Sequence, residues 1–148
     1  MEVKEKDIVA SMELFLSDLH VHYHNLRNFH WTVTGPQFYE LHQKFEDLYR
    51  SINDLIDDVA ERLLALNYSP VVSTAEIINR ANIEEQNIRL PSAEMVKIVI
   101  DQQLVLIDDV KQILKLAEAN EDKGTDDLLS PLIKDLEKEN WMLKSYLS

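Results

Sequence analysis

The sequence predicts an all-α protein, a four-helix bundle formed by a single domain over residues 1–148. Three observations predict this fold. Apolar residues recur every three or four positions over long stretches, as they do on one face of an α-helix. The chain has only two glycines, Gly35 and Gly124, which is few for a sheet protein with many tight turns. Leu, Ile, Glu, Asp and Lys dominate, a composition that favours helices.

The first helical stretch ends at a Gly-Pro pair. Gly permits a left-handed helix end and Pro restricts the residue before it, so Thr34-Gly35-Pro36 should end this helix. Its apolar stripe comprises Ile8, Met12, Phe15, Leu19, Tyr23, Leu26 and Val33.

The second stretch has no internal Gly or Pro and can run for about 30 residues, or roughly 45 Å. Asn67-Tyr68-Ser69-Pro70 should stop it. Its stripe comprises Phe38, Leu41, Phe45, Leu48, Ile52, Leu55, Val59, Leu63 and Leu66. Beyond it, Ser73-Thr74-Ala75-Glu76 matches a capping box and predicts a short helix that ends near Arg80.

Two more long helices follow. Pro91-Ser92-Ala93-Glu94 opens one, with a stripe of Met95, Ile98, Val99, Leu106, Val110, Ile113 and Leu116. A polar turn, Glu121–Thr125, precedes the last, with a stripe of Leu128, Leu132, Leu136, Leu143 and Leu147. Because Pro131 lies near its start, this helix either begins late or bends there. The long middle connection predicts a ferritin-like crossover; a helical hairpin array is the alternative, but no repeat period supports it.

Composition excludes several classes of protein. A net charge of −12 makes nucleic acid a poor partner, although an acidic surface attracts cations and also serves ordinary solubility. The absence of cysteine excludes disulfides, thiol catalysis, Fe–S clusters and thiolate zinc sites. The sequence shows neither a signal peptide nor a membrane-spanning run, so a cytoplasmic protein is expected.

Five side chains suggest a metal site: two imidazoles and three carboxylates suit Fe(II) redox chemistry, and also Zn or Mn. They are His30, His42, Glu46, Asp57 and Glu61. The last four share one face of the second helix, because His42/Glu46 and Asp57/Glu61 are each four residues apart. Glu46 and Asp57 are nevertheless separated by roughly 16 Å along the axis. Metal–ligand bonds are only about 2.0–2.3 Å long, so one straight helix cannot bring both pairs to one ion.

A two-fold dimer resolves this difficulty. If two copies lay their second helices antiparallel, the His42/Glu46 end of one meets the Asp57/Glu61 end of the other, and two equal sites form. His30, beyond the Gly35 turn, can fold back towards His42. The simpler alternative is that the carboxylates are solvated and that the histidine beside Trp31 is only packed. His20 and His24 are four apart, with His22 between them; a half-exposed polar face is the simpler reading for all three.

The stretch from His24 to His42, HNLRNFHWTVTGPQFYELH, resembles the signature of the Dps proteins, also called mini-ferritins. Asp57-Asp58-Val59-Ala60-Glu61-Arg62 is similar to the second motif of that family, and Glu139-Asn140-Trp141-Met142-Leu143 to its last helix. The resemblance spans nearly the whole chain. It implies a four-helix bundle that assembles into a hollow dodecamer, oxidises Fe(II) with hydrogen peroxide or oxygen at two-fold interfaces, stores ferric mineral and so protects against oxidative damage.

The resemblance also implies roles for individual residues. His30 and His42 would come from one subunit and Asp57 and Glu61 from its partner. Glu46 stands where most members have Asp, and Trp31 resembles an aromatic residue near the site that accepts oxidising equivalents; packing in the core is the alternative for Trp31. Asp122, Asp126 and Asp127 would line an acidic pore for iron, and the alternative for Asp126 and Asp127 is that they complement a helix N-terminus.

Two rival functions remain at this point. One is a DNA-compacting protein of the same fold, associated with the bacterial or archaeal nucleoid. Binding to DNA is not expected, because Lys4 and Lys6 are offset by Glu2 and Glu5 and neither end of the sequence is a basic arm. The other is a bundle that binds divalent metals without catalysis.

Overall fold

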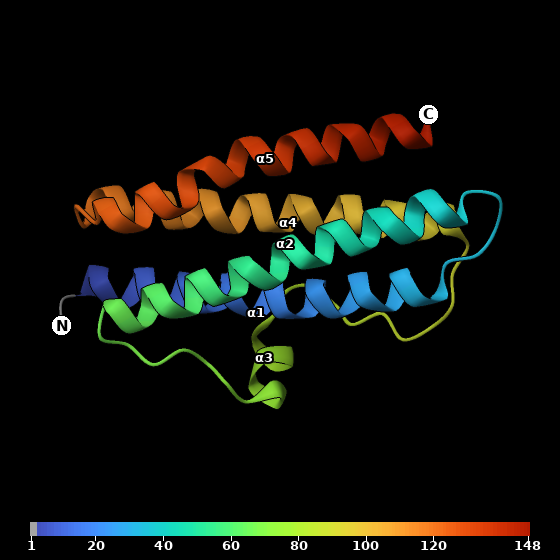
Figure 1. The fold of residues 1–148 in the computed structure, drawn as a ribbon. Coiled ribbons are helices and arrows are strands. Elements are labelled where there is room, and N and C mark those ends of the chain that lie inside the picture. The colour runs from blue at the N-terminus through green and yellow to red at the C-terminus, as the bar shows by residue number, and fades with distance from the viewer. Residues whose placement is uncertain (1–2) are drawn as a thin grey trace.

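The computed structural model describes residues 3–148, with side chains from Asp7 onward, and within this range every regular element is a helix. The expected balance of charge over residues 1–6 lies outside the described side chains. Four helices are long and one is short (Figure 1). They are α1 (Val3–Thr32), α2 (Phe38–Ala65), α3 (Thr74–Arg80), α4 (Ser92–Ala119) and α5 (Lys123–Leu147). The predicted bundle, with a short helix in its middle connection, is confirmed.

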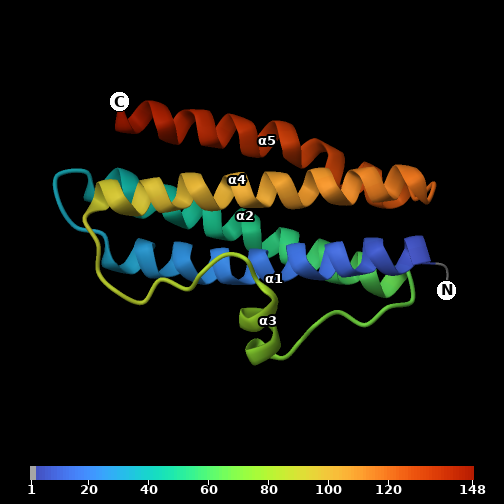
Figure 2. The same ribbon diagram turned by 180° about the vertical axis from the view of Figure 1, so that it is seen from behind.

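The bundle consists of two helical hairpins, α1–α2 and α4–α5, joined by the crossover of residues 66–91. Figure 1 shows α1 running in one direction and α2 returning beside it, and α4 and α5 repeat this pattern. Seen from behind, the crossover passes across α1 and carries α3 against it (Figure 2). None of the helices in residues 3–148 is long and apolar enough to cross a membrane.

The core lies between the long helices, where the apolar stripes meet. Fully buried side chains include Phe15 and Phe29 of α1, Phe45 of α2, Met95 of α4 and Leu129 of α5. Burying each such side chain contributes about 1.5–3 kcal/mol. The helix periodicity of the sequence therefore corresponds to the packing of the bundle.

The helix ends follow local sequence. Gly35 has a φ of +109°, so a residue without a side chain is needed in the α1–α2 turn. The Ser73 hydroxyl accepts a hydrogen bond from the Glu76 backbone N–H and caps α3, as predicted.

The polar turn before α5 is shorter than predicted. The helix already begins at Lys123, because the Asp122 carboxylate accepts a hydrogen bond from the Thr125 backbone N–H at 3.1 Å. Pro131 lies inside α5. The helix therefore does not begin late, and Figure 1 shows it bending after its first turns, which is the second of the two expected outcomes.

Polar side chains of α1 hold the crossover in place. The Asn25 amide donates to the Glu84 carbonyl oxygen at 2.9 Å and accepts from the Gln86 backbone N–H at 2.8 Å. Asn28 donates to the Gln86 carbonyl oxygen at 2.8 Å. These bonds satisfy backbone groups that the irregular crossover cannot pair internally.

The expectation of a half-exposed polar face is wrong for His22. Its ring is buried in the bundle, and its Nδ1 lies 2.7 Å from Oε1 of Gln102 on α4. Burial lowers the pKa of His22 to about 4, although the Gln102 hydrogen bond and the nearby Asp18 act to raise it. His20 is half-buried and His24 is exposed.

Candidate metal site

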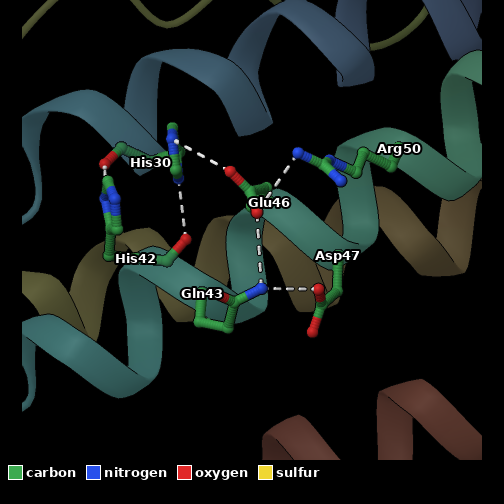
Figure 3. Close-up of polar contacts among 6 residues, drawn as sticks. All are labelled: His30, His42, Gln43, Glu46, Asp47 and Arg50. Carbon is green, nitrogen blue, oxygen red and sulfur yellow. Dashed lines mark hydrogen bonds and ion pairs between the residues drawn. The ribbon is translucent and has the colours of Figure 1, made fainter.

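His30 and His42 lie face to face at the α1–α2 turn (Figure 3). His30 is in the last turn of α1 and is buried; His42 is half-buried in the second turn of α2. Their ring centroids are 3.8 Å apart and their planes differ by 15°. The turn at Gly35 reverses the chain and brings together two side chains that are twelve positions apart in the sequence.

Each imidazole is fixed by the backbone of the other residue. Nδ1 of His30 lies 2.7 Å from the His42 carbonyl oxygen, and Nδ1 of His42 lies 2.7 Å from the His30 carbonyl oxygen. A carbonyl oxygen can only accept, so both Nδ1 atoms carry the hydrogen and donate. In the neutral form of each ring, Nε2 then keeps its lone pair. This is the arrangement of metal-binding histidines, whose second nitrogen donates to a carbonyl or a carboxylate.

Glu46 lies beside this pair, one turn beyond His42 on α2. One of its carboxylate oxygens is 3.9 Å from His30 Nε2. The other is 3.5 Å from an Arg50 guanidinium nitrogen and accepts a long hydrogen bond of 3.4 Å from Gln43 (Figure 3). Arg50 therefore competes with any cation for the Glu46 carboxylate.

Asp57 and Glu61 lie farther along α2 and are exposed. Across the described side chains, neither carboxylate has a hydrogen bond or an ion pair. Within residues 3–148, no group of three or more His, Asp or Glu side chains is placed to hold a metal ion. One chain thus brings His30, His42 and Glu46 together but leaves Asp57 and Glu61 apart, as the helix geometry predicts.

Aromatic side chains surround the imidazoles. The Tyr49 ring meets the His30 ring edge-on at 5.4 Å, and the Phe38 ring stacks on His42 at 4.9 Å. Neither residue was expected at the site from the sequence, although Phe38 lies one helical turn before His42 and Tyr49 one turn after Glu46. They restrict the orientation of the rings and exclude water from one side of them.

Trp31 does not pack in the core of this chain. Its side chain is 62% exposed, and the Arg27 guanidinium carbon lies 4.8 Å from the centre of its ring. Core packing within the subunit, the alternative for Trp31, is therefore wrong. Its role in oxidation stays a prediction.

The three predicted pore residues begin α5. Asp122 accepts a hydrogen bond from the Arg62 guanidinium at 2.8 Å, and its hydrogen bonds to Thr125 and Arg62 outweigh partial burial and lower its pKa. Lys123 contacts Asp126 at 3.0 Å and Asp127 at 3.1 Å. Each of the three carboxylates thus has a positively charged partner within the same chain. A pore between subunits stays a prediction.

The chain is similar to known proteins over nearly its whole length. Residues 13–148 match the family model described as a ferritin-like domain. General stress protein 20U of Bacillus subtilis is 37% identical over 142 residues, covering 96% of this chain and 98% of that protein. DNA protection during starvation protein 2 of Bacillus anthracis is 34% identical over 143 residues, covering 97% and 98%.

Solved structures agree with this relationship. The crystal structure of Dps from Staphylococcus aureus has a TM-score of 0.93 and 31% identity, covering 97% of this chain and 96% of that chain. The DPS protein from Vibrio cholerae O1, described as a member of a broad superfamily of ferritin-like diiron-carboxylate proteins, has a TM-score of 0.94 and 32% identity, covering 98% and 91%.

Proposed function

Because the chain belongs to the Dps family of ferritin-like proteins, we propose that it is a ferroxidase and an iron-storage mini-ferritin. Its substrate is Fe(II), and hydrogen peroxide or oxygen is the oxidant. The ferric product is stored as mineral inside a hollow dodecamer of the chain. Removing Fe(II) and peroxide together limits oxidative damage.

The observation that carries the proposal is the pair of reciprocal hydrogen bonds between His30 and His42. These bonds fix both rings with the Nδ1 hydrogens engaged and the Nε2 lone pairs free. A packed, purely structural histidine pair has no need of two matched lone pairs beside a carboxylate. Imidazole and carboxylate together suit Fe(II), and the same set accepts Zn or Mn.

In the proposed site the partner subunit supplies what one chain lacks. Asp57 and Glu61 are exposed and free of ion pairs within the described chain, so they are available to anchor iron on the neighbouring copy. His30 contacts that same iron. His42 and Glu46 hold a second, weaker position, because Arg50 already neutralises part of the Glu46 charge.

Two iron positions match the electron count of the oxidant. Each Fe(II) gives up one electron, and reduction of one peroxide molecule to water takes two electrons and two protons. If both ions are bound at one interface, they can supply the two electrons without a redox-active side chain between them. For Trp31, which follows His30 in the sequence and is exposed, the proposed role is to give up an electron when iron is lacking.

The test is to add Fe(II) and then peroxide under anaerobic conditions and to follow the ferric absorbance. The proposal expects fast oxidation by the wild type and oxidation near the protein-free rate by the His30→Ala/Asp57→Ala variant. Equal rates for wild type and variant would disprove the site. Binding of Fe(II) without faster oxidation by the wild type would instead indicate a non-catalytic metal-binding bundle.

A further inference from the structure

A second cluster of ionisable groups lies inside the bundle, away from the proposed iron site. Asp18 of α1 is fully buried, and Asp109 of α4 is half-buried and lies within hydrogen-bonding range of it. The Oδ2 atom of each carboxyl group is buried without a hydrogen-bond donor. Buried carboxylate oxygens without donors are costly, so this arrangement requires an explanation.

A single proton between the two carboxyl groups would give both unpaired oxygens a hydrogen-bond partner. Two ionised carboxylates can only accept, whereas a protonated carboxyl group can donate to its ionised neighbour. Burial, the hydrogen bond to Asp18 and the charges of Asp18 and Asp108 raise the pKa of Asp109 to about 9. The pair therefore holds one proton between its two carboxyl groups at neutral pH.

The other oxygen of Asp18 holds the crossover. Its Oδ1 accepts hydrogen bonds from the Asn82 backbone N–H at 2.7 Å and the Ile83 backbone N–H at 2.9 Å. These two residues lie in the crossover, two and three positions beyond the end of α3. Asp18 thus joins three parts of the fold, α1, α4 and the crossover, through a single carboxylate.

We propose that Asp18 and Asp109 share one proton and that this proton acts as a pH-sensitive latch. While the proton is bound, Asp18 holds residues 82–83 of the crossover against the bundle. This attachment weakens as the pH rises. Besides the pair itself, the ionisable groups that act on it are Asp108 of α4 and His22 of α1. The crossover contributes the two backbone N–H groups, which do not titrate.

The direction follows from proton binding. The latched state keeps a proton that the opened state gives up at the ordinary Asp pKa near 3.9. The equilibrium constant for closing the latch therefore falls by up to about a factor of ten for each pH unit between roughly 4 and 9. Above that range it no longer changes with pH. His22 is neutral above pH 7 whether open or closed, so the window from pH 7 to 9 isolates the carboxyl pair.

Hydrogen exchange of the assembled protein tests the latch. We expect the exchange of the Asn82 and Ile83 amides, corrected for the intrinsic pH dependence, to accelerate up to about tenfold per pH unit from pH 7 to 9. In Asp109→Asn the amide still donates to Asp18 but cannot titrate, so the corrected rate should stay flat. Asp108→Asn removes one of the charges that raise the pKa of Asp109, so its corrected rate should still rise with pH but level off at a lower pH than in the wild type.

An infrared measurement keeps the test decisive if Asp109→Asn assembles poorly. The wild type at pH 7 should show a protonated-carboxyl C=O band that disappears as the pH passes 9, and Asp108→Asn should keep this band. A flat exchange profile in the wild type, or the absence of the band at pH 7, would overturn the proposal.

Discussion

The rings of His30 and His42 stack at 3.8 Å, and each Nδ1 lies 2.7 Å from the backbone carbonyl oxygen of the other residue. The two hydrogen bonds tie the end of α1 to the start of α2 and determine which nitrogen of each ring faces outwards. If these two imidazoles bind metal as proposed, both are already oriented in the single chain, which reduces the cost of ordering the ligands on binding.

Arg50 should weaken the second iron position. Its guanidinium lies 3.5 Å from Glu46, and because Arg50 is largely exposed the ion pair is worth only about 0.2–1 kcal/mol. Arg50→Ala should therefore increase the affinity of the second position by a factor of roughly 1.4 to 5. Titration of the protein with Zn(II), read by calorimetry under anaerobic, iron-free conditions, measures this affinity.

The matched control for this prediction is a double-mutant cycle. Removal of Arg50 should have no effect on metal affinity in a Glu46→Ala background, because the competing carboxylate is gone. An equal gain in both backgrounds would show that Arg50 acts through the general charge of the surface and not through Glu46.

Acid should destabilise the bundle through His22. Its pKa is lowered to about 4 in the folded chain, whereas an unfolded histidine titrates near 6.5. The unfolded state takes up a proton first, so stability is retained above pH 6.5 and falls as the pH drops towards 4, by at most roughly 3 kcal/mol. Over the same pH range the Asp18–Asp109 proton acts in the opposite direction, so the His22 contribution is measured as the difference in unfolding free energy between the wild type and a variant without His22, at pH 7 and at pH 4.

His22→Gln should reduce this acid-dependent loss, because its amide cannot titrate. His24→Gln is the control, since His24 is on the same helix but exposed. If both variants follow the wild-type pH dependence, the buried imidazole is not the cause.

Lys123 should slow the entry of iron if Asp126 and Asp127 line a pore. Its ammonium lies 3.0 Å and 3.1 Å from these two carboxylates and offsets their charge. Lys123→Ala should therefore speed Fe(II) uptake at low ionic strength, and the gain should shrink at high salt because exposed charges are screened. Stopped-flow oxidation at two salt concentrations measures this. Asp126→Asn/Asp127→Asn should slow uptake, and unchanged rates in both variants would refute the pore.

The sequence alone predicts the helices well, because periodicity and helix ends are local properties. The apolar stripe through Phe15 and Phe45 and the stop at Gly35 need no tertiary information. Helix geometry likewise separates Glu46 from Asp57 by counting alone. The burial of His22 could not be predicted, because it depends on Gln102, eighty residues away. The same limit applies to Asp18, whose partners lie on α4 and in the crossover.

The central claim is that each iron site uses histidines from one chain and carboxylates from another. Two inactive variants test it directly: His30→Ala/His42→Ala, which keeps its carboxylates, and Asp57→Ala/Glu61→Ala, which keeps its histidines. They are unfolded, mixed in equal amounts and reassembled, and Fe(II) oxidation by peroxide is then measured anaerobically.

Random pairing makes half of the dimers mixed, and in each mixed dimer one of two sites has every ligand intact. We predict that the mixture regains about a quarter of the wild-type rate, while each variant reassembled alone stays inactive. A mixture that remains inactive, although mass spectrometry shows mixed oligomers, would contradict a site shared between two chains.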